Sequence, residues 1–244
     1  MREIPLQDNP QAFEFAARLF RSPGAPGGDF DMVIFLTGVG ARLLNQIIET
    51  RYPPGSFIEA LHRLAVVVRG SKPAAVMREW GIPVAVAVPE PNTWREVLAA
   101  TESRPERRIA VQEYGRPIPE LIGGLRARGA QVTTVPVYQW DLPKDLGPLR
   151  EAVRRLAAAE FDVVLLTTSV QISHLLRFAA QEGVEPQIRD ALARTLIASV
   201  GPTTSEALRE SGFEPDLEPS HPKMGFLVNE TAARASELLA AKRG

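Results

Sequence analysis

The sequence contains a long internal repeat, which limits the chain to folds built from two related parts. Residues 30–81 align with residues 161–212 without a gap, at a constant offset of 161 − 30 = 131. Thirteen of the 52 aligned positions are identical, including Phe30/Phe161 and Gly70/Gly201. The repeat predicts two similar domains; the alternative is chance similarity between two α/β segments.

Short apolar runs alternate with longer helical patterns along the chain. The runs are continuous, which is typical of parallel strands that are covered on both faces. This pattern predicts an α/β fold with parallel sheets. We expect strands at Met32–Thr37, Leu64–Val68, Val84–Val88, Arg108–Gln112, Gln131–Val137, Asp162–Thr167 and Thr195–Val200, with weaker ones at Glu3–Leu6 and Pro215–Glu218. Helices are expected at Arg116–Arg128, which Gly129 ends, and at Gly225–Lys242.

The two copies of the repeat continue differently. The first copy continues through three more strands, whereas the second has one weak strand and a helix before the sequence ends. The segment Ile4–Gln7 resembles Val135–Gln139, where the first copy ends. We therefore predict a discontinuous domain, residues 1–7 with 146–244, a second domain, 8–138, and a return linker, 139–145, so that the two crossings form a hinge.

The discontinuous domain has no counterpart of the strand and helix expected at Arg108–Arg128. Without such a unit, the strand at Glu3–Leu6 has no obvious neighbour. We therefore expect Met1 to be an internal start, with roughly 25 to 30 residues before it, the size of one strand-helix unit.

Composition and charge exclude several classes of function. The chain has 28 Lys and Arg against 29 Asp and Glu, and a net charge of 28 − 29 = −1 gives no general attraction for nucleic acid. It has no cysteine, and therefore no disulfide or thiolate metal site. It has no long apolar run and no signal-peptide pattern. We expect a cytoplasmic monomer with neither a nucleic-acid nor a membrane partner.

The segment Gly38-Val39-Gly40 resembles the start of a dinucleotide-binding motif but fails in detail. Leu43 stands at the third glycine position, and Glu59 falls in a helical pattern instead of at a strand end. There is no Walker A sequence or nucleophile elbow. The histidines lack metal-ligand spacing; they are His62, His174 and His221. The sequence predicts neither a cofactor nor a metal site.

Polar or glycine-rich turns recur where the predicted strands end, at the edge where open α/β sheets bind ligands. Backbone N–H groups at the following helix starts would suit anions, and Arg69 and Lys72 add cationic donors. The predicted binding residues are Thr37, Gly38, Val39, Gly40, Arg69, Gly70, Ser71, Lys72, Tyr114, Gly115, Thr167, Thr168, Ser169, Gly201, Pro202, Thr203 and Thr204. Each turn could instead be only a helix cap. Their repetition predicts a cleft between the domains for a polyanionic small molecule.

Three segments carry a resemblance to a known family. They are Val135–Gln139 (VPVYQ), Phe161–Ser169 (FDVVLLTTS) and Ala198–Leu208 (ASVGPTTSEAL). Over almost its whole length the chain resembles uroporphyrinogen-III synthases, and the most specific matches are Tyr138 and Gly201–Thr204. The resemblance implies two flavodoxin-like or similar three-layer domains joined by a two-stranded linker, in agreement with the discontinuous repeat.

The resemblance also implies an activity. Members of this family cyclise hydroxymethylbilane, a linear polycarboxylate tetrapyrrole, to uroporphyrinogen III without a cofactor, with inversion of the last ring and loss of water. Tyr138 matches the family's tyrosine and would donate a proton or hydrogen bond to the leaving hydroxyl; alternatively, it only packs on the linker. Turns at Thr37–Gly40, Thr167–Ser169 and Thr203–Thr204 would hold carboxylates. Handover of substrate from hydroxymethylbilane synthase is a further implication.

The sequence departs from the family at several points. Thr37-Gly38 stands where many members have Thr-Ser, and Lys72-Pro73 where a threonine often follows the turn. His221–Gly225 looks like a segment of synthase-like proteins that are joined to a DNA-binding regulator domain. One alternative function is therefore a non-catalytic sensor that closes its two lobes around a tetrapyrrole or another anionic effector. A generic bilobal binding protein is a third.

Overall fold

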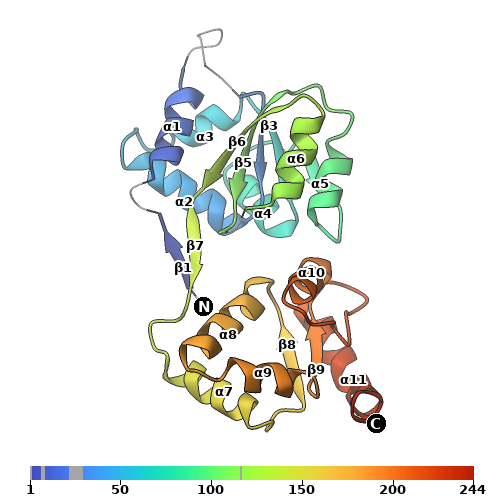
Figure 1. The fold of residues 1–244 in the computed structure, drawn as a ribbon. Helices are drawn as coiled ribbons and strands as arrows, with labels where there is room; N and C mark the ends of the chain where they lie inside the picture. Colours follow the sequence, from blue (N-terminus) through green and yellow to red (C-terminus); the bar gives the residue numbers. More distant parts are fainter. Residues whose placement is uncertain (1, 7–8, 22–29, 116) are drawn as a thin grey trace. The chain divides into compact units, whose positions relative to one another are not determined.

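The chain forms two compact units in the structure, which is a computed structural model. It describes residues 2–6, 9–21, 30–115 and 117–244 (Figure 1). Unit 1 consists of Met1–Arg2 and Asp141–Gly244, and unit 2 consists of Glu3–Trp140. The chain therefore passes from one unit to the other twice.

The boundaries of the units differ from the predicted domains, 1–7 with 146–244 and 8–138. Strands β1 (Arg2–Pro5) and β7 (Tyr138–Asp141) form a two-stranded sheet, the linker that the family resemblance implied. Just beyond β1, the Leu6 N–H donates to the Val137 carbonyl oxygen at 3.1 Å. Because this pairing ties the N-terminal strand to the return strand, residues 3–6 belong to unit 2. The predicted linker 139–145 is divided after residue 140.

Unit 2 is built on a five-stranded parallel sheet with the strand order β4-β3-β2-β5-β6. The strands are β2 (Met32–Phe35), β3 (Ala65–Arg69), β4 (Val86–Val88), β5 (Arg108–Glu113) and β6 (Gln131–Pro136). All five were predicted, with ends that differ by at most two residues. The central strand β2 pairs with β3 on one side and β5 on the other, and all of its residues are buried.

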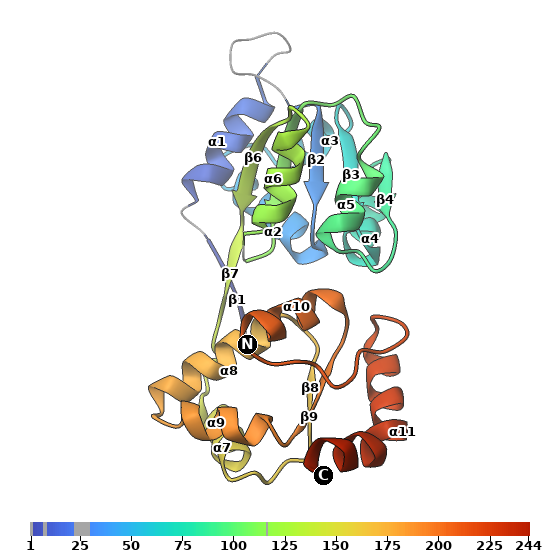
Figure 2. The same ribbon diagram turned by 45° about the vertical axis from the view of Figure 1, so that its right-hand side comes forward.

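Helices cover both faces of this sheet and give unit 2 three layers (Figure 2). On one face, α2 (Gly38–Glu49) contacts α1 (Pro10–Leu19), α3 (Ser56–Leu61) and α4 (Ser71–Glu79). On the other face, α5 (Trp94–Ala100) packs against α6 (Pro119–Ala127). Helix α6 begins three residues later than predicted because Pro119 occupies its first turn, where a missing N–H costs nothing; the predicted first residue, Arg116, lies outside the described residues.

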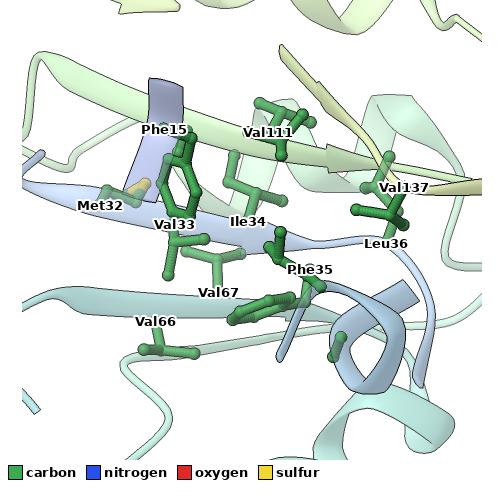
Figure 3. Close-up of a cluster of buried hydrophobic side chains, with 14 of the residues drawn as sticks. Phe15, Met32, Val33, Ile34, Phe35, Leu36, Val66, Val67, Val111 and Val137 are labelled. Carbon is green, nitrogen blue, oxygen red and sulfur yellow. The ribbon is translucent and has the colours of Figure 1, made fainter. Parts of the chain in front are cut away.

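The core of unit 2 fixes the strand ends that carry the predicted site. Phe15 of α1 and the side chains of β2, β3 and β5 form a buried apolar cluster (Figure 3). Leu36 and Val137 belong to the same cluster and are 2% and 0% exposed. Burial of a large apolar side chain contributes about 1.5–3 kcal/mol. These two residues therefore anchor the backbone directly before Thr37 and Tyr138.

Unit 1 contains a smaller parallel sheet of β8 (Val163–Leu166) and β9 (Leu196–Ser199). The predicted strand at Pro215–Glu218 is reduced to one bridge, between Ala198 and Leu217. Helices surround the sheet: α7 (Gly147–Ala157), α8 (Val170–Gln181), α9 (Glu185–Leu192), α10 (Pro202–Glu210) and α11 (Met224–Arg243). None of the helices in the described part of the chain is long and apolar enough to cross a membrane.

The two units use the repeat differently. Strand β8 is the repeat counterpart of β2, but among the described residues it pairs only with β9. As a result, Leu165 is 37% exposed, whereas its counterpart Ile34 is fully buried. The prediction of an α/β fold with two parallel sheets is confirmed, and the sheet of unit 1 is the smaller one.

Candidate functional site

The predicted catalytic residue, Tyr138, lies beside the predicted binding residue Thr37 in unit 2. Tyr138 is the first residue of β7, and Thr37 follows β2 and caps α2. The hydroxyl oxygens Tyr138 Oη and Thr37 Oγ1 are 3.4 Å apart, and either hydroxyl can donate to the other. Because the strands of the sheet are parallel, β2 and β6 end at the same edge and bring these two residues together.

The phenol of Tyr138 is kept in its neutral form. The side chain is 2% exposed, and burial raises the pKa of Tyr138 to about 12 because the phenolate would lose its hydration. The hydrogen bond with Thr37 acts in the opposite direction and favours the charged form. Trp140 meets the Tyr138 ring edge-on, with ring centroids 5.7 Å apart. At neutral pH this group is a hydrogen-bond donor.

Thr37 is held by hydrogen bonds at both its side chain and its backbone. The Gly40 N–H donates to Thr37 Oγ1 at 3.0 Å, as at a helix N-cap. The Thr37 N–H donates to Gln112 Oε1 at 3.3 Å. Gln112 is fully buried in β5, and its Nε2 donates to the Glu113 carbonyl oxygen. Both ends of the Gln112 amide are therefore used at this edge of the sheet.

Tyr114, Gly115 and Arg69 lie at the same edge of the sheet. The φ angle of Gly115 is +84°, and a Cβ there would lie 2.6 Å from Trp140 Cδ1 and 3.3 Å from Tyr138 Cε2. Trp140 Nε1 donates to the Tyr114 carbonyl oxygen at 3.1 Å. The Arg69 guanidinium carbon lies 4.5 Å from the centroid of the Tyr114 ring, in cation–π geometry. Arg69 also lowers the pKa of Tyr138, so its charge is felt at the phenol.

The turns that open α2 and α4 lie side by side. A Cβ on Gly38 would be 2.9 Å from the Lys72 carbonyl oxygen, so only glycine allows this approach. Ser71 and Lys72, in the first turn of α4, are exposed, and Val39 is 40% exposed. Two helix N-termini and the Lys72 charge at one edge favour the binding of anions.

Glu113 is a carboxyl group at the same edge. It ends β5 and is half-buried, and burial raises the pKa of its carboxyl. A shift toward the neutral form reduces repulsion of an anionic ligand.

In unit 1, the turn at Thr167–Ser169 is closed by a glutamine. The N–H groups of Thr167 and Thr168 both donate to Gln171 Oε1, at 2.7 and 3.0 Å. Thr168 Oγ1 accepts from the Val170 N–H at 3.3 Å. The prediction that these backbone groups are free for an anion is wrong for Thr167 and Thr168, because a side chain of the same turn already occupies them.

The turn at Gly201–Thr204 is packed against the segment that precedes α11. A Cβ on Gly201 would lie 2.9 Å from Pro222 Cβ. Thr204 is 3% exposed and its N–H donates to the Gly201 carbonyl oxygen at 2.9 Å, whereas Thr203 is only half-buried. Thr203 is therefore the hydroxyl of this turn that is better placed to meet a ligand.

Two serines form hydrogen bonds next to this turn. Ser205 Oγ lies 2.5 Å from Ser199 Oγ and donates to Glu218 Oε2. The network links the end of β9 to the first turn of α10.

The predicted binding residues leave out Gln112, Gln171 and Trp140. Gln112 begins one of the polar turns at the strand ends and directly continues the apolar run Ile109–Val111. Such a residue in a buried strand needs hydrogen-bond partners. Gln171 and Trp140 gave no comparable signal, because each acts through the geometry of a turn.

The histidines lie on different segments, and His174 is one helical turn after Gln171 in α8. His62 is exposed, and the His221 ring meets the Phe226 ring edge-on, with ring centroids 4.7 Å apart. His174 is half-buried, and burial lowers its pKa. No group of three or more His, Asp or Glu that could hold a metal ion occurs in the described ranges.

Known proteins resemble this chain in sequence and in fold. It is 30% identical to the uncharacterized protein YjjA of Bacillus subtilis over 205 residues, which are 83% of this chain and 75% of YjjA. The crystal structure of uroporphyrinogen III synthase from the extremely thermophilic bacterium Thermus thermophilus matches with 26% identity and a TM-score of 0.54, covering 97% of this chain and 85% of that one. The Helicobacter pylori uroporphyrinogen-III synthetase structure shares the fold at 15% identity and a TM-score of 0.54, over 88% of this chain and 87% of that one.

The family assignment rests on nearly the whole chain. The family model described as uroporphyrinogen-III synthase HemD matches residues 3–229, from β1 into α11. The match includes Tyr138, the turns of unit 2 and both turns of unit 1. This chain belongs to the uroporphyrinogen-III synthase family.

Proposed function

We propose that this chain is an active uroporphyrinogen-III synthase, a lyase that converts hydroxymethylbilane to uroporphyrinogen III without a cofactor. The observation that carries the proposal is the buried, neutral phenol of Tyr138 beside the Thr37 hydroxyl, at the carboxyl edge of the sheet. The family match supports the choice of substrate.

The reaction begins with loss of the substrate's hydroxyl group. Hydroxide is a poor leaving group, and a hydrogen bond or proton from the Tyr138 phenol lets it depart as water. The cation that remains on the tetrapyrrole is attacked by the hindered carbon of the last ring, and a spiro intermediate rearranges to the inverted product. The proton released when aromaticity is restored returns to the phenolate. The phenol is regenerated, and the net change is loss of one water.

Thr37 assists the phenol in this scheme. A hydroxyl that donates to Tyr138 Oη stabilises negative charge there, in the direction in which Thr37 lowers the phenol's pKa. The burial of Tyr138 keeps water from competing with the leaving group.

We assign carboxylate binding to the turns of each unit. In unit 2, Lys72, Ser71 and Arg69 offer donors beside the first turns of α2 and α4. In unit 1, Thr203 is the half-buried hydroxyl of its turn. A polycarboxylate tetrapyrrole matches these donors in charge.

The proposal is tested by incubation of the protein with freshly made hydroxymethylbilane and separation of the isomers. The expected product is the type III isomer, above the type I isomer that forms spontaneously. If only type I appears, the synthase proposal is overturned.

A sensor is the second candidate function. It is favoured by Gly38, where many relatives of this type have a hydroxyl and where the Lys72 carbonyl leaves no room for a side chain. A sensor would bind the product tetrapyrrole tightly without turnover. Titration with uroporphyrinogen III, followed by quenching of the intrinsic Trp fluorescence, measures that binding in the same preparation.

A further inference from the structure

Gln112 is a fully buried amide that follows the apolar run Ile109–Val111 of β5, and it accepts a hydrogen bond from Thr37, the residue beside the proposed acid. We propose that Gln112 is a positioning residue, which holds Thr37 so that the Thr37 hydroxyl faces the Tyr138 phenol. The inference rests on the proposed function, because the phenol's role in turnover is part of that function.

The internal repeat identifies the residue of unit 1 that has the same hydrogen-bonding role as Gln112. At the offset of 131, Thr37 corresponds to Thr168 and Gly40 corresponds to Gln171. In unit 1, Gln171 accepts the Thr168 N–H from within its own helix. In unit 2, the equivalent N–H of Thr37 is accepted by Gln112, which comes from the neighbouring strand β5.

The Gln112 amide fills the space that a side chain at position 40 would need. A Cβ at position 40 would overlap the amide group of Gln112. Position 40 therefore has no room for a helix-borne glutamine while Gln112 is present. The acceptor comes from the helix in unit 1 and from the neighbouring strand in unit 2, where Gly40 leaves room for it.

The hydroxyls of the two equivalent threonines, Thr168 and Thr37, also have different hydrogen-bond partners. In unit 1, Thr168 Oγ1 accepts from the N–H two residues later, at 3.3 Å. In unit 2, Thr37 Oγ1 accepts from the N–H three residues later, at 3.0 Å, and lies 3.4 Å from Tyr138 Oη. Since the Gly40 N–H is the donor in that cap, the Thr37 proton remains available for the phenol oxygen. The phenol's own proton is then available for the substrate.

Gln112 also fixes the strand end that leads to Tyr114. Its Nε2 donates to the Glu113 carbonyl, and the next residue accepts from Trp140, which packs on Tyr138. The Gln112 amide therefore links the backbone of Thr37 to that of Glu113.

The test compares Gln112→Leu with the matched variant Gln171→Leu in the full-length protein. Both changes keep the side-chain volume and remove an acceptor from a threonine N–H. For Gln112→Leu we expect kcat to fall about tenfold, which is less than the roughly hundredfold or more of a general acid because the phenol itself remains, with little change in KM. For Gln171→Leu we expect a smaller change in kcat, because Gln171 accepts from the N–H groups of Thr167 and Thr168 in unit 1 and not from Thr37.

A second readout is independent of turnover. Tyrosine labelled with ¹³C at Cζ reports the hydrogen bonding of the phenol by NMR, and Tyr138→Phe assigns the signal. We expect Gln112→Leu to shift the Tyr138 signal and Gln171→Leu to leave it in place. If the wild-type protein makes no type III isomer, the proposed function fails, while the NMR shift still tests the positioning role.

A rescue variant separates positioning from general stability. Gly40→Gln combined with Gln112→Gly transfers the arrangement of unit 1 into unit 2. We expect it to recover part of the kcat lost in Gln112→Gly alone and to return the Tyr138 signal toward its wild-type position. Melting temperatures of all variants are recorded, and Gln112→Met replaces Gln112→Leu if the latter does not fold. Wild-type kcat together with an unmoved Tyr138 signal in Gln112→Leu would overturn the inference, as would equal effects of Gln112→Leu and Gln171→Leu on the signal.

Discussion

The Thr37 hydroxyl lies 3.4 Å from the hydroxyl of Tyr138, at the end of a buried strand. This separation is longer than the usual O–H···O hydrogen bond of about 2.5–3.0 Å. Catalytic hydrogen bonds are often long in ligand-free enzymes and shorten when substrate binds. If the phenol acts as proposed, we expect this separation to shorten when substrate binds.

Tyr138→Phe tests the acid directly. The substitution removes one hydroxyl and keeps the ring that Trp140 packs against. We expect formation of uroporphyrinogen III to slow by roughly tenfold to a thousandfold, on the order of a general-acid contribution with some replacement by water. Steady-state rates with hydroxymethylbilane measure this, and unchanged kinetics would remove Tyr138 from the mechanism.

Thr37→Val and Thr37→Ser form a matched pair. Valine keeps the shape but loses both the cap to the Gly40 N–H and the contact with Tyr138, whereas serine keeps the hydroxyl. We expect Thr37→Val to lower kcat about tenfold and to lower the free energy of unfolding by about 1 kcal/mol, the usual value of an N-cap. Thr37→Ser should retain most of both quantities. Equal rates for the two variants would contradict a role for the hydroxyl.

Periodicity predicted the fold of unit 2 well and that of unit 1 less well. The apolar runs of β2, β3 and β5 are buried on both faces, so their composition alone identified them. Pro215–Glu218 has only a weak strand pattern, and it pairs at Leu217 alone. Strand formation there depends on packing against neighbouring segments, which the local sequence does not show. The ladder between β1 and β7 joins segments that are far apart in the chain, and its effect on the unit boundaries could not be inferred from either segment alone.

The sequence led to the residues of the candidate site but not to their hydrogen bonds. The rule for the carboxyl edge of parallel sheets led to Thr37, the family resemblance led to Tyr138, and the structure places their hydroxyls 3.4 Å apart. The same rules treated the N–H groups of Thr37 and Thr168 as alike and available, yet each is occupied by a glutamine from a different element. Which side chain satisfies a given backbone group is decided by packing in three dimensions.

The raised pKa of Tyr138 predicts a loss of stability in alkaline solution. Its folded-state pKa of about 12 lies above the ordinary value of 10.0. The folded state therefore keeps its phenolic proton where the unfolded state loses it. The stabilisation is fully present below about pH 10 and is lost as the pH rises toward 12, with a total on the order of 2 to 3 kcal/mol for a two-unit shift.

Comparison with Tyr138→Phe isolates this contribution from other groups that titrate at high pH. Urea unfolding at about pH 8 and about pH 11, on either side of the ordinary tyrosine pKa, gives the loss of stability for each protein. We expect the wild-type protein to lose more than Tyr138→Phe between these two values. Equal losses would show that the phenol ionises normally.

Gly115→Ala tests the close packing behind the phenol. Gly115 has a φ of +84°, and an added Cβ would lie 2.6 Å from Trp140 Cδ1. Gly81 is a suitable control, since its φ is +70° and nothing lies within 4 Å of its Cβ position. We expect Gly81→Ala to cost about 1 kcal/mol from backbone strain alone. Gly115→Ala should cost about 2 kcal/mol or more and should also lower kcat, because Trp140 must move away from Tyr138.

Ile34 and Leu165 occupy equivalent positions of the repeat but differ in burial. Ile34 is fully buried between two strands, whereas Leu165 is 37% exposed on β8. We expect Ile34→Ala to lower the free energy of unfolding by about 2–5 kcal/mol, the cost of a cavity in a packed core. Leu165→Ala should cost less, about 1–2 kcal/mol, because Leu165 is 37% exposed and its removal leaves no enclosed cavity. Urea denaturation, with the two units followed separately by hydrogen exchange, measures both values. If Leu165→Ala lowers the free energy of unfolding as much as Ile34→Ala does, Leu165 is buried in solution by contacts that this structure does not show.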